Sequence, residues 1–404
     1  MNKRYDYRIL GRNFRVTNDT YVTGLNNNDL IIGGSGSGKT GGVLYPSLKA
    51  TENESFVFID SKGLMSKMFK SELEAKGYEV RILSFIHPEE SCGYNPLDYI
   101  RFNTDGSIRY QDIVFLSRAI MPSLEKDEPI WEECGILILQ FLIAFCFERL
   151  DKEDWNMNTI IDLYHVMIKP NGLQYFLDEL DNRKESFAMK KLLEIQAYKS
   201  ADKMYSSILG FVNIALAPFS YPESKSLLNT HNCIKLHDIG KRKHAVFIQV
   251  SDVDRTYDVL VNIFMTQVLK TLIEDADSNS GGRLKIPTRL YFDDMGANCT
   301  VPDFAKIISV IRSRDIYVSV ILQSMAQLYA MYGEHDALAI LSNCDHIVYL
   351  NSNDMSSVEY VSNRAFKTKE SILNMSRTKE YILTSGERAV LIDKNPPYAD
   401  IDFE

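Results

Sequence analysis

A glycine-rich segment near the N-terminus has the residue types of a phosphate-binding loop. Residues 33–40 read GGSGSGKT and fit the pattern G-x-x-x-x-G-K-[ST] at every fixed position. Glycines let the backbone turn its N–H groups toward an anion, and the start of a helix adds a favourable dipole. In such a loop Lys39 reaches the β- and γ-phosphates, and Thr40 ligates Mg²⁺ through its hydroxyl. We therefore expect nucleotide contacts from the whole loop: Gly33, Gly34, Ser35, Gly36, Ser37, Gly38, Lys39 and Thr40.

Acidic residues at the ends of two apolar runs are candidates for the rest of a hydrolytic site. Hydrolysis needs an acid that holds the Mg²⁺ shell and a group that orients the attacking water. The run 290–292 ends in Asp293 and Asp294, so Asp293 is expected to ligate Mg²⁺ and Asp294 to face the water. The run 56–59 ends in Asp60, which on local sequence is nearly as good a candidate. For either acid the alternative is that it caps the next helix or turn.

Two arginines and a glutamine flank another apolar run, 316–322. Arg312 and Arg314 precede this run, and Gln323 follows it. In open α/β sheets the ends of strands face the ligand, so we expect Gln323 to sense the γ-phosphate. An arginine near such an edge can complete the site of a neighbouring subunit and stabilise transition-state charge. The alternative for either arginine is a surface ion pair.

The elements that must position these residues can be read from short apolar runs. Such runs lie at 29–32, 55–60, 78–85, 244–250, 288–293, 316–322 and 346–350. They are continuously apolar, as strands of a parallel sheet are when helices cover both faces. Between 107 and 236, apolar residues recur at helical spacing instead. We expect a doubly wound α/β domain in two parts, 1–106 and 237–404, interrupted by an all-α domain at 107–236. The second part ends in a short acidic tail to which no function is assigned.

Composition places limits on the class of protein. The 404 residues carry a net charge of −9, which argues against a protein that coats itself in nucleic acid. The six cysteines form no C-x-x-C pair, which fits a reducing cytoplasm. The N-terminal residues lack the apolar core of a signal peptide. The longest apolar run, 134–147, falls short of the ~20 residues that cross a bilayer and is interpreted as a buried helix.

Taken together, these segments resemble the conjugative type IV coupling proteins, the TraG-like DNA-transfer ATPases of type IV secretion systems. The resemblance covers nearly the whole chain and depends on GGSGSGKT at 33–40, IDSKG at 59–63, GYNPLDYI at 93–100 and residues 290–350. It implies a RecA-like P-loop NTPase fold with ATP and Mg²⁺ as cofactors. It also places the family's second acidic motif on Asp293, its arginine finger on Arg312 and its sensing glutamine on Gln323.

The resemblance further implies partners and a location. The expected assembly is a homo-hexameric ring around a pore, with 107–236 at the face that receives transfer substrates; the oligomeric state in isolation stays open. Expected partners are single- or double-stranded DNA, a relaxase and components of the secretion channel. The expected location is the cytoplasm, at the inner face of the plasma membrane. Membrane attachment would come from a removed anchor or from a partner, because the chain starts about thirty residues before its loop.

Departures from the family pattern leave alternatives open. Asp294 stands where the family usually carries Glu, and DSKGL at 60–64 differs from the more common D-P-K-G-E. A shorter acid favours a second hypothesis, a substrate-docking adaptor that binds nucleotide with little turnover. A third is a soluble double-strand DNA pump, which would lack GYNPLDYI and the helical insertion. The densest basic residues are candidates for DNA contact or a solvated helix face: Lys184, Lys190, Lys191, Lys199, Lys203, Lys241, Arg242 and Lys243.

Overall fold

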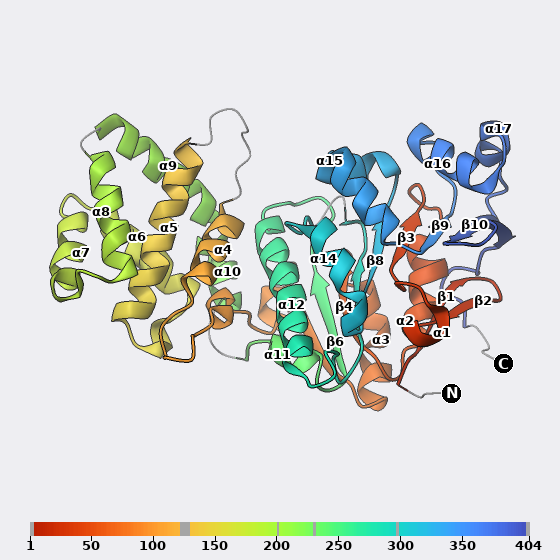
Figure 1. Cartoon of the computed structure of the whole chain (residues 1–404), viewed down its shortest axis with the longest axis horizontal. Helices are drawn as coiled ribbons and strands as arrows, with labels where there is room; N and C mark the ends of the chain where they lie inside the picture. The colour runs from red at the N-terminus through yellow and green to blue at the C-terminus, as the bar shows by residue number, and fades with distance from the viewer. Residues whose placement is uncertain (1–3, 122–129, 200–201, 229–231, 296–298, 401–404) are drawn as a thin grey trace. The chain divides into compact units, whose positions relative to one another are not determined.

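The protein folds into two compact units (Figure 1). The computed structural model describes residues 4–121, 130–199, 202–228, 232–295 and 299–400. Unit 1 comprises Met1–Ile82, Lys235–Arg255 and Val268–Glu404, and unit 2 comprises Leu83–Ile234 and Thr256–Gln267. Residues 296–298 of the 290–350 segment and the last four residues of the acidic tail lie outside the described residues.

Unit 1 is built on a nine-stranded sheet with the order β11-β10-β9-β3-β8-β7-β4-β6-β5. Neighbouring strands from β9 to β6 run parallel, whereas β10 is antiparallel to both β9 and β11. The predicted mainly parallel sheet is therefore confirmed. The strands are β3 (Asp29–Ile32), β4 (Ser55–Asp60), β5 (Glu79–Ser84), β6 (His244–Gln249), β7 (Thr288–Phe292), β8 (Ile316–Leu322), β9 (His346–Tyr349), β10 (Lys379–Thr384) and β11 (Val390–Asp393).

The antiparallel strands were not predicted from the sequence. Besides β10 and β11, they include a separate hairpin of β1 (Tyr7–Gly11) and β2 (Phe14–Thr17). Most of β2 and β11 is half-buried or exposed, so neither strand needs the continuous apolar run by which the central strands are recognised. These strands matter because β11 leads the chain back toward the phosphate-binding loop.

Helices cover both faces of the sheet in unit 1. Right-handed crossovers place α2 (Tyr45–Lys49) and α3 (Leu64–Ala75) on one face and α14 (Phe304–Val310) and α15 (Met325–Ser342) on the other (Figure 1). The core beneath α2 and α3 is aromatic-rich and includes Tyr45, Phe56, Phe58, Phe69, Phe247 and Tyr291. Further helices of unit 1 are α1 (Thr20–Thr23), α11 (Leu236–Ile239), α16 (Met355–Ala365) and α17 (Lys369–Leu373); α12 (Asp258–Ser278) begins in unit 2 and ends in unit 1.

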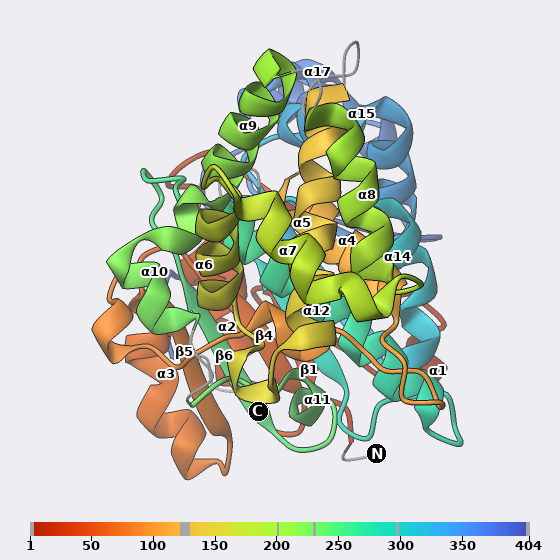
Figure 2. The same ribbon diagram turned by 90° about the vertical axis from the view of Figure 1, so that its left-hand side faces the viewer.

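Unit 2 is helical and packs around one apolar helix, α5 (Ile130–Arg149). Residues 138, 139 and 141–146 of α5 are at most 1% exposed, which confirms the buried helix predicted at 134–147. Figure 2 shows α5 behind α7 and α8. Helix α5 contacts α4, α6, α8 and α9, and its Phe141 and Phe145 pack on Phe176 of α7. The helices are α4 (Tyr110–Ile120), α6 (Met157–Met167), α7 (Gly172–Leu180), α8 (Phe187–Lys199), α9 (Asp202–Ser220) and α10 (Pro222–Leu227). Among the described residues, no helix is both long and apolar enough to span a bilayer.

The GYNPLDYI segment belongs to the helical unit. Gly93 bridges Cys233, the Tyr94 hydroxyl donates to Gln267, and the Asn95 amide donates to the Trp155 carbonyl oxygen at 2.7 Å. The compact unit that contains them spans Leu83–Ile234 and Thr256–Gln267. The all-α insertion domain at 107–236 stays a prediction.

A buried ionic network lies at the amino ends of the central strands. The Asp29 carboxylate accepts from Arg8 Nε at 3.0 Å, Arg289 Nη1 at 3.1 Å and the Ser319 hydroxyl at 2.9 Å. Arg8 Nη2 also lies 3.2 Å from His346 Nδ1. These five residues are at most 2% exposed. Because four of them lie on β3, β7, β8 and β9, the network joins the four strands whose opposite ends carry the predicted site.

Glu54 borders this network and gives a pH test of it. Burial, and secondly the charge of Asp6, raise the pKa of Glu54 from 4.5 to about 7. The folded state therefore binds the proton more tightly than the unfolded state, and this stabilising contribution is lost as pH rises from 4.5 to about 7. We expect Glu54→Gln to gain stability relative to wild type by up to about 1.4 kcal/mol per pH unit in this window. Urea denaturation at pH 5, 6 and 7 measures the difference.

The matched control is Glu52→Gln, because Glu52 is exposed. It makes the same change of side chain at an exposed position, so the Glu54→Gln difference is compared with it at each pH. A Glu54→Gln difference that changes with pH no more than that of Glu52→Gln would contradict a buried, proton-binding Glu54.

Candidate active site

The phosphate-binding loop lies at the carboxyl ends of three parallel strands. Gly36 and Gly38 have φ of 70° and 97°, a left-handed conformation that glycine adopts without strain. Gly33 N donates to the Leu322 carbonyl oxygen at 3.1 Å, and Gly34 N donates to that of Asn351 at 2.9 Å. These bonds tie the loop to the ends of β8 and β9. The loop therefore occupies the edge where open α/β sheets bind their ligands.

The helix after the loop starts in an unusual way. Gly41, Gly42 and Pro46 make this stretch a poor α-helix former. In the structure Lys39–Leu44 form a π-helical turn, and α2 begins only at Tyr45, with Pro46 in its first turn where proline fits. Because Gly41 and Gly42 have no side chains, this segment does not cover its own backbone directly after Thr40.

Lys39 is folded back onto its own loop. Its Nζ donates to the carbonyl oxygens of Gly33 at 2.6 Å and Gly34 at 3.2 Å. The side chain is buried, and burial lowers its pKa although the charges of Asp294 and Asp293 oppose this shift. The ammonium group is therefore beside the position where phosphates would enter the loop.

Thr40 follows β3 and Asp293 follows β7, and the two side chains are hydrogen-bonded at the carboxyl edge of the sheet. The Thr40 hydroxyl donates to Asp293 Oδ2 at 3.0 Å. Asp293 is 5% exposed, and its Oδ1 is buried without a hydrogen-bond partner among the described residues. Burial, and secondly the charge of Asp294, raise the Asp293 pKa to about 7. A threonine hydroxyl beside an unpaired carboxylate oxygen is a donor set that fits Mg²⁺.

Asp60, the other candidate acid, caps a helix instead. Its carboxylate accepts from Leu64 N at 3.0 Å and from the backbone N and hydroxyl of Ser66, both at 2.8 Å. Gln249 in turn donates to the Ser66 hydroxyl at 2.8 Å. Because these bonds occupy both oxygens of Asp60 at the start of α3, the geometry favours Asp293 as the metal ligand.

Asp294 and Gln323 line the same cavity as the loop. This cavity has a volume of about 310 Å³ and is bounded by Ser35, Gly36, Ser37, Gly38, Lys39, Thr40, Gly41, Lys62, Asp294, Gln323, Pro397 and Tyr398. Asp294 has φ of 49°, a left-handed conformation that Asp tolerates, and its Oδ1 has no hydrogen-bond partner among the described residues. The Gln323 side chain is exposed directly after β8. Both side chains can thus reach a water or phosphate oxygen in this cavity.

Arg312 is not brought to the loop. It lies before β8, at the opposite end of that strand from Gln323, and Nη2 donates to the Gly24 carbonyl oxygen at 2.6 Å. The seven residues of β8 alone span roughly 23 Å. Arg314 pairs with Asp277 at 2.7 Å, as in the surface ion-pair alternative. Arg312 therefore lies away from the loop of its own chain, and its role as an arginine finger stays a prediction.

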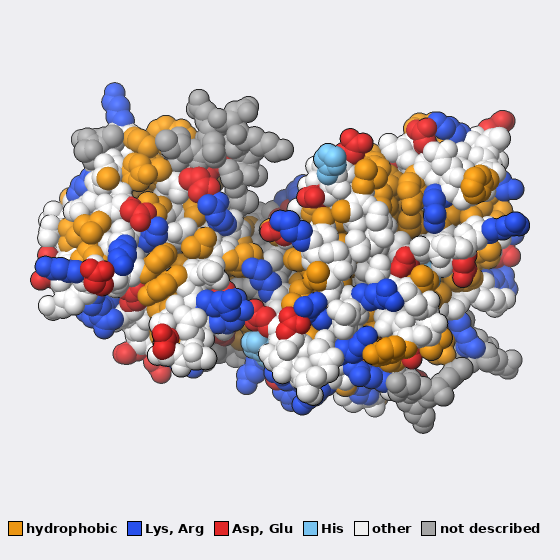
Figure 3. Space-filling view, in the orientation of Figure 1, with side chains coloured by type: hydrophobic (Ala, Val, Ile, Leu, Met, Phe, Trp, Pro, Cys, Tyr) orange, Lys and Arg blue, Asp and Glu red, His pale blue; other side chains and the backbone are white. Residues whose placement is uncertain are grey.

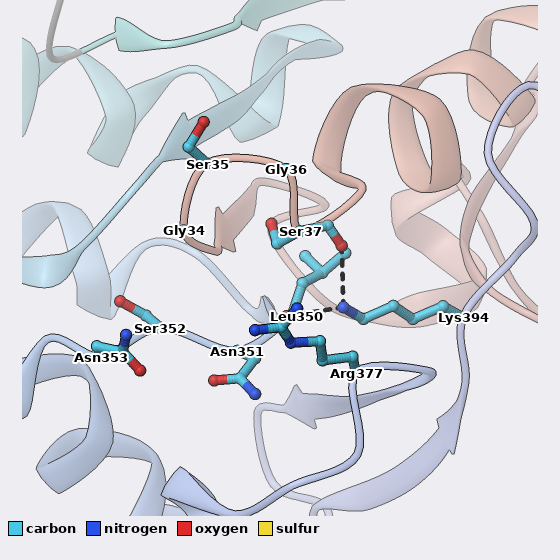
Figure 4. Close-up of a pocket in the computed structure, with 10 residues that line it drawn as sticks. All are labelled: Gly34, Ser35, Gly36, Ser37, Leu350, Asn351, Ser352, Asn353, Arg377 and Lys394. Atoms are coloured by element: carbon cyan, nitrogen blue, oxygen red, sulfur yellow. Dashed lines mark hydrogen bonds between the residues drawn. The ribbon is translucent and has the colours of Figure 1, made fainter.

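Several residues of the site were missed by sequence reasoning. Lys62, Pro397 and Tyr398 line the loop cavity, although 395–404 reads as a tail without function. A second cavity of about 250 Å³ lies between residues 34–37 and the segment after β9, with Arg377 and Lys394 in its wall (Figure 4). Only Lys62 carried a sequence signal, because it follows the acid at the end of β4.

Four of the eight predicted basic residues pair with acids. Lys190 lies 3.3 Å from Glu185, and Lys191 lies 2.9 Å from Glu194. In unit 1, Arg242 pairs with Asp238 at 2.6 Å and Lys241 with Asp275 at 3.5 Å. On the face seen in Figure 3, Lys and Arg are interspersed with Asp and Glu. DNA contact by these residues stays a prediction.

Comparisons with known proteins identify a matching family and similar folds. Residues 4–388 match the family described as Type IV secretory system Conjugative DNA transfer. The fold is similar to the plasmid coupling protein TrwB in complex with the ATP analogue ADPNP (TM-score 0.70, 14% identity, 92% of this chain and 86% of that chain). It is also similar to TrwB in complex with ADP and Mg²⁺ (0.68, 15%, 92% and 86%) and to VirB4 of Thermoanaerobacter pseudethanolicus (0.61, 12%, 98% and 98%). No curated protein sequence matches the chain.

The two acids at strand ends can be separated by matched substitutions. Asp293→Asn removes the charge of the predicted Mg²⁺ ligand, so we expect the gain in nucleotide affinity that Mg²⁺ provides to fall by about tenfold or more. Asp60→Asn removes a helix cap and should instead lower the free energy of unfolding by about 1 kcal/mol while keeping the Mg²⁺ effect. Calorimetric titration of ADP with and without Mg²⁺, together with urea denaturation, measures both. The reverse pattern would identify Asp60 as the metal ligand.

Proposed function

Because the chain belongs to the type IV secretory system family of conjugative DNA transfer, we propose that it is an ATP-hydrolysing coupling protein. In this role it recruits relaxase-bound DNA and moves it through a type IV secretion system. The observation that carries the proposal is the 3.0 Å contact of Thr40 with Asp293, beside the buried Lys39. Two segments far apart in the sequence thereby meet, and their residues are of the types that ATP-hydrolysing sites use.

Each residue of the site has a role in the proposed reaction. Thr40 and Asp293 would hold Mg²⁺, which when bound offsets negative charge on the β- and γ-phosphates. Lys39 binds the same phosphates after leaving its carbonyl partners. Asp294 orients a water and accepts its proton as the water oxygen bonds to the γ-phosphorus and the bond to the β–γ bridging oxygen breaks. Gln323 senses the γ-phosphate at the end of β8.

Arg312 supports a ring as the working assembly. Arg312 lies away from the loop of its own chain. The arginine finger of each site would therefore come from a neighbouring subunit, as in sites completed in trans. We propose a homo-hexamer in which Arg312 of one subunit contacts the nucleotide of the next. Nucleotide turnover would then be coupled to movement of subunits against the DNA strand.

The central test is hydrolysis stimulated by DNA. Under ring-forming conditions, single- or double-stranded DNA should raise ATP hydrolysis well above that of Lys39→Ala, which lacks the phosphate-binding ammonium group. Release of inorganic phosphate measures the rate. Nucleotide binding without turnover in the wild type would favour the adaptor hypothesis, since the shorter Asp294 would then fail to activate water.

A mixing experiment tests the neighbour role of Arg312. Lys39→Ala and Arg312→Ala are each expected to lower hydrolysis by at least a hundredfold. An equimolar mixture should regain part of the activity, because Arg312 of a Lys39→Ala subunit can complete the intact loop of an Arg312→Ala subunit. Arg314→Ala is the control and should retain activity. A mixture no more active than its components would contradict a shared site.

A further inference from the structure

We propose that Tyr398 forms the stacking surface for the base of the bound nucleotide, with Pro397 beside it. The inference rests on the proposed function, because it concerns the same nucleotide. It assigns a role to the segment after β11, which the sequence presents only as a polar tail.

The segment 394–398, called the strap, is hydrogen-bonded to the loop and to the turn that follows the loop. Lys394 Nζ donates to the carbonyl oxygens of Ser37 at 2.9 Å and Leu350 at 2.7 Å (Figure 4). The Asn395 amide donates to the Gly42 carbonyl oxygen at 2.8 Å, and Tyr398 N donates to that of Gly41 at 3.0 Å. The strap thus follows the loop and the first turn of its helix.

The order of the phosphates along the loop indicates that the sugar and base lie beside the strap. Lys39 and Asp294 mark the γ-phosphate end of the cavity, and the loop amides cradle the next phosphates. The α-phosphate therefore lies at the backbone after Thr40, and the sugar and base must leave past Gly41. A Cβ at Gly41 would lie 2.9 Å from Cβ of Pro397, so the strap is in direct contact with this backbone. Pro397 and Tyr398 are thus beside the exit from the phosphate site.

The Tyr398 ring packs against Tyr45, and part of its surface is accessible. Its centroid lies 5.6 Å from that of Tyr45 at an interplanar angle of 75°. The residue is nevertheless 43% exposed, and it lines the loop cavity. Its φ of 55° is a left-handed conformation that is rare for an aromatic residue. Backbone strain of this kind persists where surrounding contacts fix it, and here the bond to Gly41 does so.

An aromatic platform accepts any base with a planar face. Stacking gives affinity without reading the hydrogen-bonding edge of the base. We therefore expect Tyr398 to strengthen the binding of ATP and GTP to a similar degree. The phosphates alone should not depend on it.

The experiment compares ATP with inorganic tripolyphosphate, each with Mg²⁺, by calorimetric titration of the whole chain. Tyr398→Ala is expected to weaken ATP by about tenfold and to leave tripolyphosphate within twofold of wild type. Tyr398→Phe keeps the ring and should bind both as wild type does. Thermal melting of each variant shows whether the fold is retained.

Equal weakening of ATP and tripolyphosphate by Tyr398→Ala would overturn the inference, because the strap would then act only by holding the loop. Unchanged ATP affinity would overturn it as well. A wild-type chain that binds neither compound would instead overturn the proposed function itself.

Discussion

The geometry of the site depends on the buried carboxylate of Asp29. This carboxylate lies at the opposite end of the strands from the site residues. Asp29 begins the strand that leads into the phosphate-binding loop, and its carboxylate is held by Arg8, Arg289 and Ser319. Removing this acid would leave two buried arginines without their carboxylate partner, so the pairing is costly to disturb. Because the partners lie on separate strands, their bonds fix how those strands are aligned. That alignment determines which residues meet at the carboxyl edge, where Thr40 reaches Asp293.

Segments from the whole length of unit 1 converge on this edge. The loop at 33–40, the acids at 293–294, Gln323 and the strap at 394–398 line or border one cavity. A parallel sheet makes this possible, because all its central strands end on the same side. The antiparallel pair β10 and β11 then reverses the chain and returns it across the first helical turn after the loop. The last described part of unit 1 is therefore part of the site.

The parallel strands and the loop could be predicted because each leaves a local mark: a continuous apolar run, or glycines ending in Lys-Thr. Asp293 could not be separated from Asp60 in this way, since both follow apolar strands. Only the bonds from Leu64 and Ser66, which occupy Asp60, distinguish them. Tyr398 could not be predicted either, because its neighbours Gly41 and Tyr45 are more than three hundred positions away in the sequence. Its local context, NPPYAD, is that of an ordinary polar end.

The hydrogen bonds from Lys39 to two carbonyl oxygens limit the binding free energy that a phosphate gains from this lysine. The ammonium group already has two oxygen partners in Gly33 and Gly34, so an entering phosphate must replace them. Affinity then reflects the difference between a phosphate oxygen and a peptide oxygen as acceptors, not the full attraction of a bare cation. A single weak anion gains little from that exchange. A chain of phosphates that also recruits the loop amides and the threonine hydroxyl gains at every position, so the resting lysine favours polyvalent ligands over simple salts.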